Sequence, residues 1–296
     1  MKKNLNQDQV KKLVKLIKTK LSKINQARQT TVFLCGGDVK DERFGRHKMA
    51  NLFSKHDNYE VLYPEDIFDD LLAGQGQFSL LSLENLLADA VDAIVIFPES
   101  PGSYTELGAF CNNPDLARKL ICVQDARFKY KKSFINYGPI RLLKTNRMGK
   151  LLTYNNDDFS DYFKARRFFR KVSMAISNIK SKNPVKVTAD NIIYSEDFIL
   201  PCIYLMDEIN NILLYEFLKQ ATGMGDTLCE IATKSALGRL IDKQKIVRTI
   251  EGYHVTELGA AFVRENYARK PLDSLRLEIM NFENRSKATI NYDRVS

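Results

Sequence analysis

The sequence predicts an α/β domain built on a parallel sheet, preceded by a basic amphipathic helix and followed by a smaller, mostly helical domain. Short β-branched runs alternate with helical segments between residues 31 and 179, as in strands joined by crossover helices. A lysine-rich segment precedes this region, and a polar linker with a proline, residues 180–184, follows it. We therefore divide the chain into residues 1–30, 31–183 and 184–296.

The composition is that of a globular protein without a membrane segment. The 296 residues are 27% charged and 44% hydrophobic, and no apolar run approaches the ~20 residues that cross a bilayer. The N-terminus lacks the apolar core of a signal peptide. Five scattered cysteines form no CxxC motif and lie near no histidine cluster. We therefore expect no metal site, no disulfide framework and a cytoplasmic location.

The charge favours a polyanionic partner. The formal net charge is +9, and basic side chains that neutralise phosphates release counterions. Residues 1–30 hold nine basic residues and one acid, Asp8, and a second basic group lies between Arg141 and Lys182. Apolar residues at helical spacing from Val10 to Ile24 predict an amphipathic helix over residues 7–26. Its lysine face either binds a partner or is only solvated.

The central region predicts five strands in order. They are short runs rich in apolar or β-branched residues, at residues 31–35, 59–63, 94–97, 119–123 and 151–154. Helices are expected between or after them at residues 41–55, 80–90, from Thr105 onward, and 158–179. Residues 124–150 are aromatic, basic and irregular; they either cover a pocket or are ordinary core and loop.

Candidate ligand-binding residues follow the first two strands. Gly36, Gly37 and Asp38 come directly after the first strand, and Glu65 follows the second. Glycines let a ligand approach the backbone closely, and ligands of open α/β sheets bind at the carboxyl ends of the strands. The alternative for Glu65 is a cap on the following helix. The chain has neither a GxGxxG fingerprint nor a P-loop.

The stretch from Ala93 to Phe110 is the centre of the prediction. A buried strand is followed by a turn that contains Ser100, Gly102 and Ser103, and then by Glu106. Ser103-x-x-Glu106 has the form of a capping box, which places the start of a helix near Thr105. Glu106 then either caps that helix or acts as a catalytic carboxylate at the sheet edge.

Gly102-Ser103-x-x-Glu106, directly after a strand, resembles the signature of nucleoside deoxyribosyltransferase-like proteins and of lysine-decarboxylase-like nucleotide-cleaving enzymes. In those families this glutamate acts at the anomeric carbon of a nucleoside or nucleotide. The resemblance implies that Glu106 is a nucleophile or charge stabiliser for an oxocarbenium-like transition state. We expect Asp38 to orient the sugar, and Ser103 with backbone N–H groups to hold a phosphate or ribose hydroxyl.

The C-terminal region has a different pattern. Helices are expected over residues 207–220, 226–233 and 235–243, followed by strands at 245–249 and 253–255 and a helix at 256–267. This order resembles a winged helix-turn-helix, which reads nucleic acid with its third helix. The phosphate-binding candidates are Lys234, Arg239, Lys243, Lys245 and Arg248. Protein binding is the alternative. The tail after Pro271 is apolar enough to dock.

The segments LCGGD, YPED and PESPGSYTELGAF, in that order and ahead of a winged helix, resemble the effector proteins encoded beside retron reverse transcriptases. That resemblance implies toxic NAD hydrolysis in antiphage defence, with NAD as substrate and no separate cofactor. It also implies the reverse transcriptase and its branched RNA–DNA product (msDNA) as partners, in a higher-order assembly. The transferases' N-terminal catalytic tyrosine has no clear counterpart, which favours hydrolysis over base exchange.

Two other functions fit the sequence. One is a metabolic deoxyribosyltransferase or nucleotide-cleaving hydrolase, which needs neither the basic arm nor the winged helix. The other is a DNA-binding regulator whose α/β domain senses a nucleotide without turning it over.

Overall fold

The computed structural model describes residues 7–21, 28–65, 80–146 and 148–292. They divide into two compact units, which we call the sheet unit and the helical unit. The sheet unit is Arg28–Lys186, and the helical unit joins Met1–Ala27 to Val187–Ser296. The N-terminal segment therefore belongs to the same unit as the C-terminal region.

The sheet unit contains the expected five-stranded parallel sheet, in the order β2-β1-β3-β4-β5. The strands are β1 (Thr30–Cys35), β2 (Tyr59–Leu62), β3 (Ala93–Ile96), β4 (Leu120–Asp125) and β5 (Lys150–Tyr154). Every residue of β3 and β4 is buried, because helices cover both faces of a parallel sheet and strands inside it are apolar throughout.

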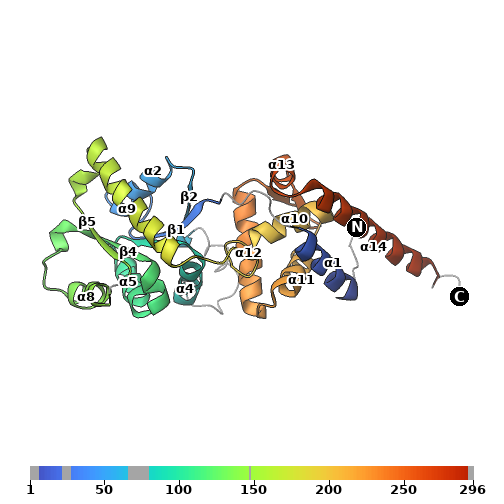
Figure 1. Ribbon diagram of the computed structural model, residues 1–296, viewed down its shortest axis with the longest axis horizontal. Helices are drawn as coiled ribbons and strands as arrows, with labels where there is room; N and C mark the ends of the chain where they lie inside the picture. Colours follow the sequence, from blue (N-terminus) through green and yellow to red (C-terminus); the bar gives the residue numbers. More distant parts are fainter. Residues whose placement is uncertain (1–6, 22–27, 66–79, 147, 293–296) are drawn as a thin grey trace. The chain divides into compact units, whose positions relative to one another are not determined.

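Helices cover the two faces of this sheet (Figure 1). On one face, α2 (Gly45–Phe53) and α9 (Tyr162–Lys182) pack through Met49 and Val172 against Val95 and neighbouring strand residues. On the other face, Phe110 of α5 (Pro101–Asn112) packs edge-on against Phe33, with ring centroids 6.4 Å apart. The helices that accompany α5 are α4 (Leu80–Ala90), α6 (Pro114–Lys119) and α8 (Pro139–Thr145).

Residues 124–150 are more regular than their sequence suggested. They contain a short 3₁₀ helix (Ala126–Phe128), α7 (Phe134–Tyr137) and α8. Asp125 accepts a hydrogen bond from the Arg127 N–H, Ser133 caps α7, and Pro139 is the first residue of α8. These are ordinary helix-start residues, but the helices they begin are too short to show a periodic apolar face.

In the helical unit, the amphipathic helix is confirmed as α1 (Gln7–Lys20). Val10, Leu13, Val14 and Ile17 are buried, and α1 contacts α11 (Asn211–Thr222) and α14 (Arg269–Tyr292). The Lys20 ammonium lies 2.6 Å from the Glu278 carboxylate. Residues 22–26 of the expected helix lie outside the described residues.

The helix predictions for this unit were wrong at one place, and they missed one helix. A single helix, α12 (Asp226–Asp242), replaces the two short helices expected there. A further helix, α10 (Glu196–Met206), was missed because it is apolar on all sides and contains Pro201, so it shows no amphipathic period. Its residues from Phe198 to Met206 are all buried.

The expected strands form an antiparallel hairpin, β6 (Ile246–Arg248) and β7 (Tyr253–Val255), and Ile209 bridges to Tyr253. Thr256 caps α13 (Glu257–Asn266) by accepting a hydrogen bond from the Gly259 N–H at 3.1 Å. In α14, Leu275 and Ile279 are buried, while Leu277 and Met280 are exposed. None of the helices within the described residues combines the length and apolar character needed to cross a bilayer.

Candidate functional site

The candidate site lies where the strand order reverses, between β1 and β3. These strands are neighbours in the sheet, although β2 and the segment after it separate them in the chain. Gly36 follows β1, and the Ser100 hydroxyl from the turn after β3 donates to the Gly36 carbonyl at 3.3 Å. Because the connections leave β1 and β3 in opposite directions, a crevice opens at their carboxyl ends, where sheets of this kind bind ligands.

The start of α5 differs from the prediction. The helix begins at Pro101, and Ser100 is its N-cap. The capping box joins Ser100 to Ser103: the Ser103 N–H donates to Ser100 Oγ at 3.2 Å, and the Ser100 N–H donates to Ser103 Oγ at 2.8 Å. The expected box between Ser103 and Glu106 is therefore wrong. Proline at the first helical position also explains the earlier start.

Glu106 is consequently free of any capping role. It is the sixth residue of α5, in the second turn, beyond the N–H groups that a cap satisfies. Its Oε2 atom is buried and has no hydrogen-bond partner among the described residues. A buried carboxylate oxygen without a partner is costly, so its position calls for a ligand group or another explanation.

The surroundings of Glu106 also keep it partly protonated near neutral pH. Burial is the main cause that raises the pKa of its carboxyl group to about 7, and the Glu84 carboxylate adds to the shift, while the Arg46 guanidinium opposes it. The Cys35 thiol at the end of β1 interacts with the same carboxyl group. A carboxyl group with a pKa near 7 suits proton transfer or nucleophilic chemistry at physiological pH.

Arg46 places a positive charge near Glu106, and its side chain is almost completely buried. Its side chain is 2% exposed, and it donates to the carbonyls of Leu34 and Gly37 at 3.1 and 2.9 Å. Nη1, which also donates to the Gly37 carbonyl, and Nη2 donate to the two Glu65 oxygens, at 2.7 and 2.8 Å. Although burial opposes ionisation, these hydrogen bonds hold the pKa of Glu65 below its usual value. A Cβ on Gly36 would lie 2.8 Å from the Arg46 Cβ, so glycine there permits this packing.

Glu99 is a second carboxyl group at the edge of the sheet. Its Oε2 accepts the Gly45 N–H at the start of α2 at 2.9 Å, and the Tyr154 hydroxyl donates to Oε1 at 3.3 Å. Burial raises the pKa of Glu99 to about 7, and the Gly45 N–H partly offsets this shift. Burial, with the Glu99 carboxylate nearby, also raises the pKa of Tyr154.

Sequence reasoning missed Glu99, Arg46 and Glu84. Glu99 comes two residues after Phe97 at the end of a buried strand, the same signal that selected Asp38, so it could have been found. Arg46 and Glu84 lie within helices, and no local pattern marks them as groups that reach the sheet edge.

The remaining sheet-edge candidates occupy different settings. Asp38 is exposed, and its Oδ1 accepts the Lys40 N–H at 2.9 Å, so its side chain stabilises its own turn. Ser103 is fully buried within the cap of α5. Gly37 packs against the Phe44 ring, whereas Gly102 is exposed and its nearest neighbour to an added Cβ is Ser100 Oγ at 4.0 Å. Within the described residues no group of three His, Cys, Asp or Glu side chains could hold a metal ion.

The nucleic-acid candidates in the helical unit are also unequal. Arg239 is 8% exposed, and it donates to the Ile193 carbonyl inside the unit, which removes it from the surface expected for a phosphate contact. Lys243 pairs with Glu196 at 2.9 Å, and Lys234 pairs with Glu230 at 2.8 Å. Lys245 lies 3.4 Å from the centre of the Phe262 ring.

Comparison with known proteins identifies the family. The family model described as STM3845 retron effector protein matches residues 42–249, which is more than two thirds of the chain and includes the carboxyl edge described above, except for residues 34–38 at the end of β1 and after it. The chain belongs to the STM3845 retron effector protein family. The resemblance to retron effectors inferred from the sequence motifs is therefore confirmed.

Two curated relatives of this retron effector come from Escherichia coli. It is 50% identical over 272 residues to the protein named "Retron Ec86 putative ribosyltransferase/DNA-binding protein", covering 90% of this chain and 89% of that protein. It is 31% identical over 159 residues to "Retron Ec73 putative ribosyltransferase/DNA-binding protein", covering 51% of this chain and 50% of that protein.

Proposed function

We propose that the sheet unit of this retron effector hydrolyses the N-glycosidic bond of a nucleotide, with NAD as substrate and nicotinamide and ADP-ribose as products. The observation that carries the proposal is the Glu106 carboxyl group, whose Oε2 is buried without a hydrogen-bond partner in the described residues and whose helix follows directly on β3 at the strand-order reversal. Membership of the retron effector family and the ribosyltransferase names of two relatives support it.

In the proposed reaction, the bond between the ribose anomeric carbon and the nicotinamide nitrogen breaks, and its electron pair neutralises the pyridinium ring. The ionised Glu106 carboxylate stabilises the oxocarbenium-like carbon or bonds to it covalently. Water then adds to that carbon and loses a proton to a carboxylate or to solvent; where a covalent bond to Glu106 has formed, that bond breaks in this step and its electron pair returns to the carboxylate. Because nicotinamide leaves as a neutral molecule, the reaction needs no general acid at the leaving group.

The turn before α5 is the proposed anchor for the rest of the nucleotide. α5 has 12 residues and begins with Pro101 and Gly102. Proline has no N–H, and the Ser103 N–H is bound by Ser100 Oγ, so the Gly102 N–H and the helix dipole are what the amino end offers to a phosphate. Gly102 has open space around it, which would permit close approach. Gly36 and Gly37 would line the opposite side of the crevice, and Asp38 would have to leave its turn with Lys40 to orient the ribose.

For the helical unit we propose a winged-helix-like nucleic-acid or protein contact through which msDNA and the retron reverse transcriptase control the enzyme in a larger assembly. The supporting observations are the order α10, α11, α12 and the β6–β7 hairpin, and the DNA-binding names of the two relatives. Lys234, Lys243, Lys245 and Arg248 remain the candidate contacts.

The deciding experiment incubates the protein with NAD, alone and with its reverse transcriptase and msDNA, and measures free nicotinamide. Release of nicotinamide with equal formation of ADP-ribose supports hydrolysis. Transfer of deoxyribose between added bases, without NAD cleavage, would favour the metabolic transferase. Saturable NAD binding without any product would favour a nucleotide sensor.

A further inference from the structure

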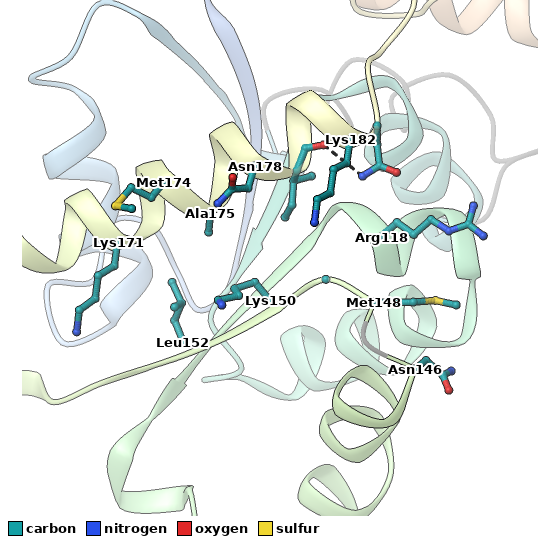
Figure 2. Close-up of a pocket in the computed structure, with 13 residues that line it drawn as sticks. Arg118, Asn146, Met148, Lys150, Leu152, Lys171, Met174, Ala175, Asn178 and Lys182 are labelled. Carbon is teal, nitrogen blue, oxygen red and sulfur yellow. Dashed lines mark hydrogen bonds between the residues drawn. The ribbon is translucent and has the colours of Figure 1, made fainter.

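A basic hollow of about 810 Å³ lies on the sheet unit between α9, α6 and the start of β5. Figure 2 shows Lys171 and Lys182 reaching from α9 toward β5, with Lys150 on β5 and Arg118 on α6. The lining residues in the described part of the chain include four cations and no Asp or Glu. A hollow of one charge sign focuses potential and attracts the opposite charge.

The hollow is separate from the Glu106 site. Gly149 precedes β5, Lys150 is its first residue, and Arg118 comes just before β4. These residues therefore lie at the amino ends of parallel strands. Glu106 and Glu99 lie at the carboxyl edge. A ligand of the hollow therefore does not occupy the proposed NAD site.

One stripe of α9 builds the wall of the hollow. Lys171, Met174, Asn178 and Lys182 are spaced by three or four residues and so share a helix face. All four are exposed. Lys150, Lys171 and Lys182 form no ion pair within the described residues, whereas Arg118 forms an ion pair with the exposed Asp115, at 3.1 Å. The three lysine charges are therefore available to an anion.

We infer that this hollow binds the phosphate backbone of a nucleic acid. The four cations are spread over two helices and a strand, as is suitable for binding several phosphates along a chain. The side-chain amides of Asn146 and Asn178 add neutral hydrogen-bond donors. Cationic and amide side chains are both common contacts to phosphate and sugar. No aromatic side chain lines the hollow within the described residues, so it offers no base-stacking platform. Because contacts to phosphate and sugar carry no base information, the binding should not depend on the nucleotide sequence.

This inference adds a contact to the nucleic-acid control proposed above and rests on it for its biological role. It moves one nucleic-acid contact onto the unit that carries Glu106. Nucleic-acid binding is measured without NAD turnover. A result that contradicts binding in the hollow can therefore be told apart from a result that contradicts NAD hydrolysis.

The test compares Lys150→Ala/Lys171→Ala/Lys182→Ala with Lys55→Ala/Lys132→Ala/Lys270→Ala in the full chain. Both triple variants lose three exposed charges, and the second set lies outside the hollow. Binding of a labelled oligonucleotide is followed by fluorescence anisotropy from 50 to 200 mM salt. Each lost phosphate contact removes about 0.7–0.9 from the slope of log affinity against log salt, so the hollow variant should lose about 2–3 and the control variant should keep the wild-type slope.

Three results would overturn the inference. The first is an unchanged slope in the hollow variant, and the second is an equal loss in both variants, which would show an effect of net charge alone. The third comes from competition with inorganic tripolyphosphate and with poly-glutamate: if either binds the hollow as tightly as the oligonucleotide, the site takes a small phosphate or an acidic peptide instead. Weak competition by both supports a nucleic-acid backbone. Unchanged thermal unfolding confirms that both variants are folded.

Discussion

Arg46 and Glu65 form a bidentate ion pair, with nitrogen–oxygen distances of 2.7 and 2.8 Å. The Arg46 side chain is 2% exposed, whereas the Glu65 side chain is 53% exposed. The same guanidinium holds the carbonyls of Leu34 and Gly37. One buried cation thus joins the ends of β1 and β2 and lies close enough to Glu106 to influence its charge.

Arg46→Lys should destabilise the protein even though it keeps the charge. A lysine cannot replace the planar fork, so the Leu34 and Gly37 carbonyls and one Glu65 oxygen lose donors. Unsatisfied buried groups of this kind cost on the order of 2 kcal/mol together. Urea unfolding measures the loss.

Arg43→Lys is the matched control. Arg43 also forms a bidentate ion pair, with Asp41, but the Arg43 side chain is 86% exposed. Exposed pairs contribute little, so this change should stay within about 0.5 kcal/mol of wild type. Equal effects of the two substitutions would show that the buried fork does not matter.

Gly45→Ala should lower stability, although alanine normally stabilises a helix. An added Cβ would lie 2.7 Å from Glu99 Oε1 and 2.8 Å from both Phe97 Cδ1 and the Tyr154 hydroxyl. Overpacking of this kind costs about 1–3 kcal/mol. Gly108→Ala in α5 meets nothing within 4 Å, so it should stabilise by about 0.5–1 kcal/mol. The thermal unfolding temperature should therefore fall for Gly45→Ala and rise for Gly108→Ala. A change in the same direction for both variants would contradict the packing around Glu99.

Glu99→Gln should make the protein more stable at pH 8 than wild type, with little difference at pH 4. The folded pKa of Glu99 is about 7, above its usual value of 4.5. A group with a raised folded pKa contributes its stability below the unfolded pKa and loses it as pH rises through the folded pKa. Glutamine cannot ionise, so it avoids a penalty on the order of 2 kcal/mol at pH 8. An equal difference at both pH values would mean that Glu99 titrates normally.

The hydrolase activity itself should rise with pH. Glu106 acts as a carboxylate in the proposed reaction, and its pKa in the free protein is about 7. The pH profile of kcat/KM reports the free enzyme, so it should increase about tenfold from pH 6 to pH 8 and level off above that. Glu99→Gln should leave this transition in place. A profile that is flat between pH 6 and 8 would exclude Glu106 ionisation as the controlling step.

Local sequence patterns predicted the sheet because strands buried on both faces are apolar throughout, as in β3 and β4. They also placed Glu106 at the correct edge. The start of α5 was wrong by four residues, at Pro101 instead of near Thr105, because two overlapping serine patterns, Ser100 with Ser103 and Ser103 with Glu106, compete for the same cap.

The charges around Glu106 could not be predicted in the same way. The groups that shift its pKa include Glu84 on α4, Arg46 on α2 and Cys35 on β1, so they are brought near Glu106 by tertiary packing and not by spacing in the chain. The α10 helix was missed for a related reason, since a helix buried on all sides has no polar face.

The most direct test of the central claim is nicotinamide release from NAD by Glu106→Gln, measured beside wild type with any partner that activates the wild-type protein. Glutamine keeps the shape of the side chain and removes its charge, and Glu106 caps no helix, so thermal stability should be equal or higher at pH 8, given the raised pKa of Glu106. We expect at least a hundredfold loss of activity with the fold intact. Wild-type rates from the folded variant would contradict a catalytic role for Glu106.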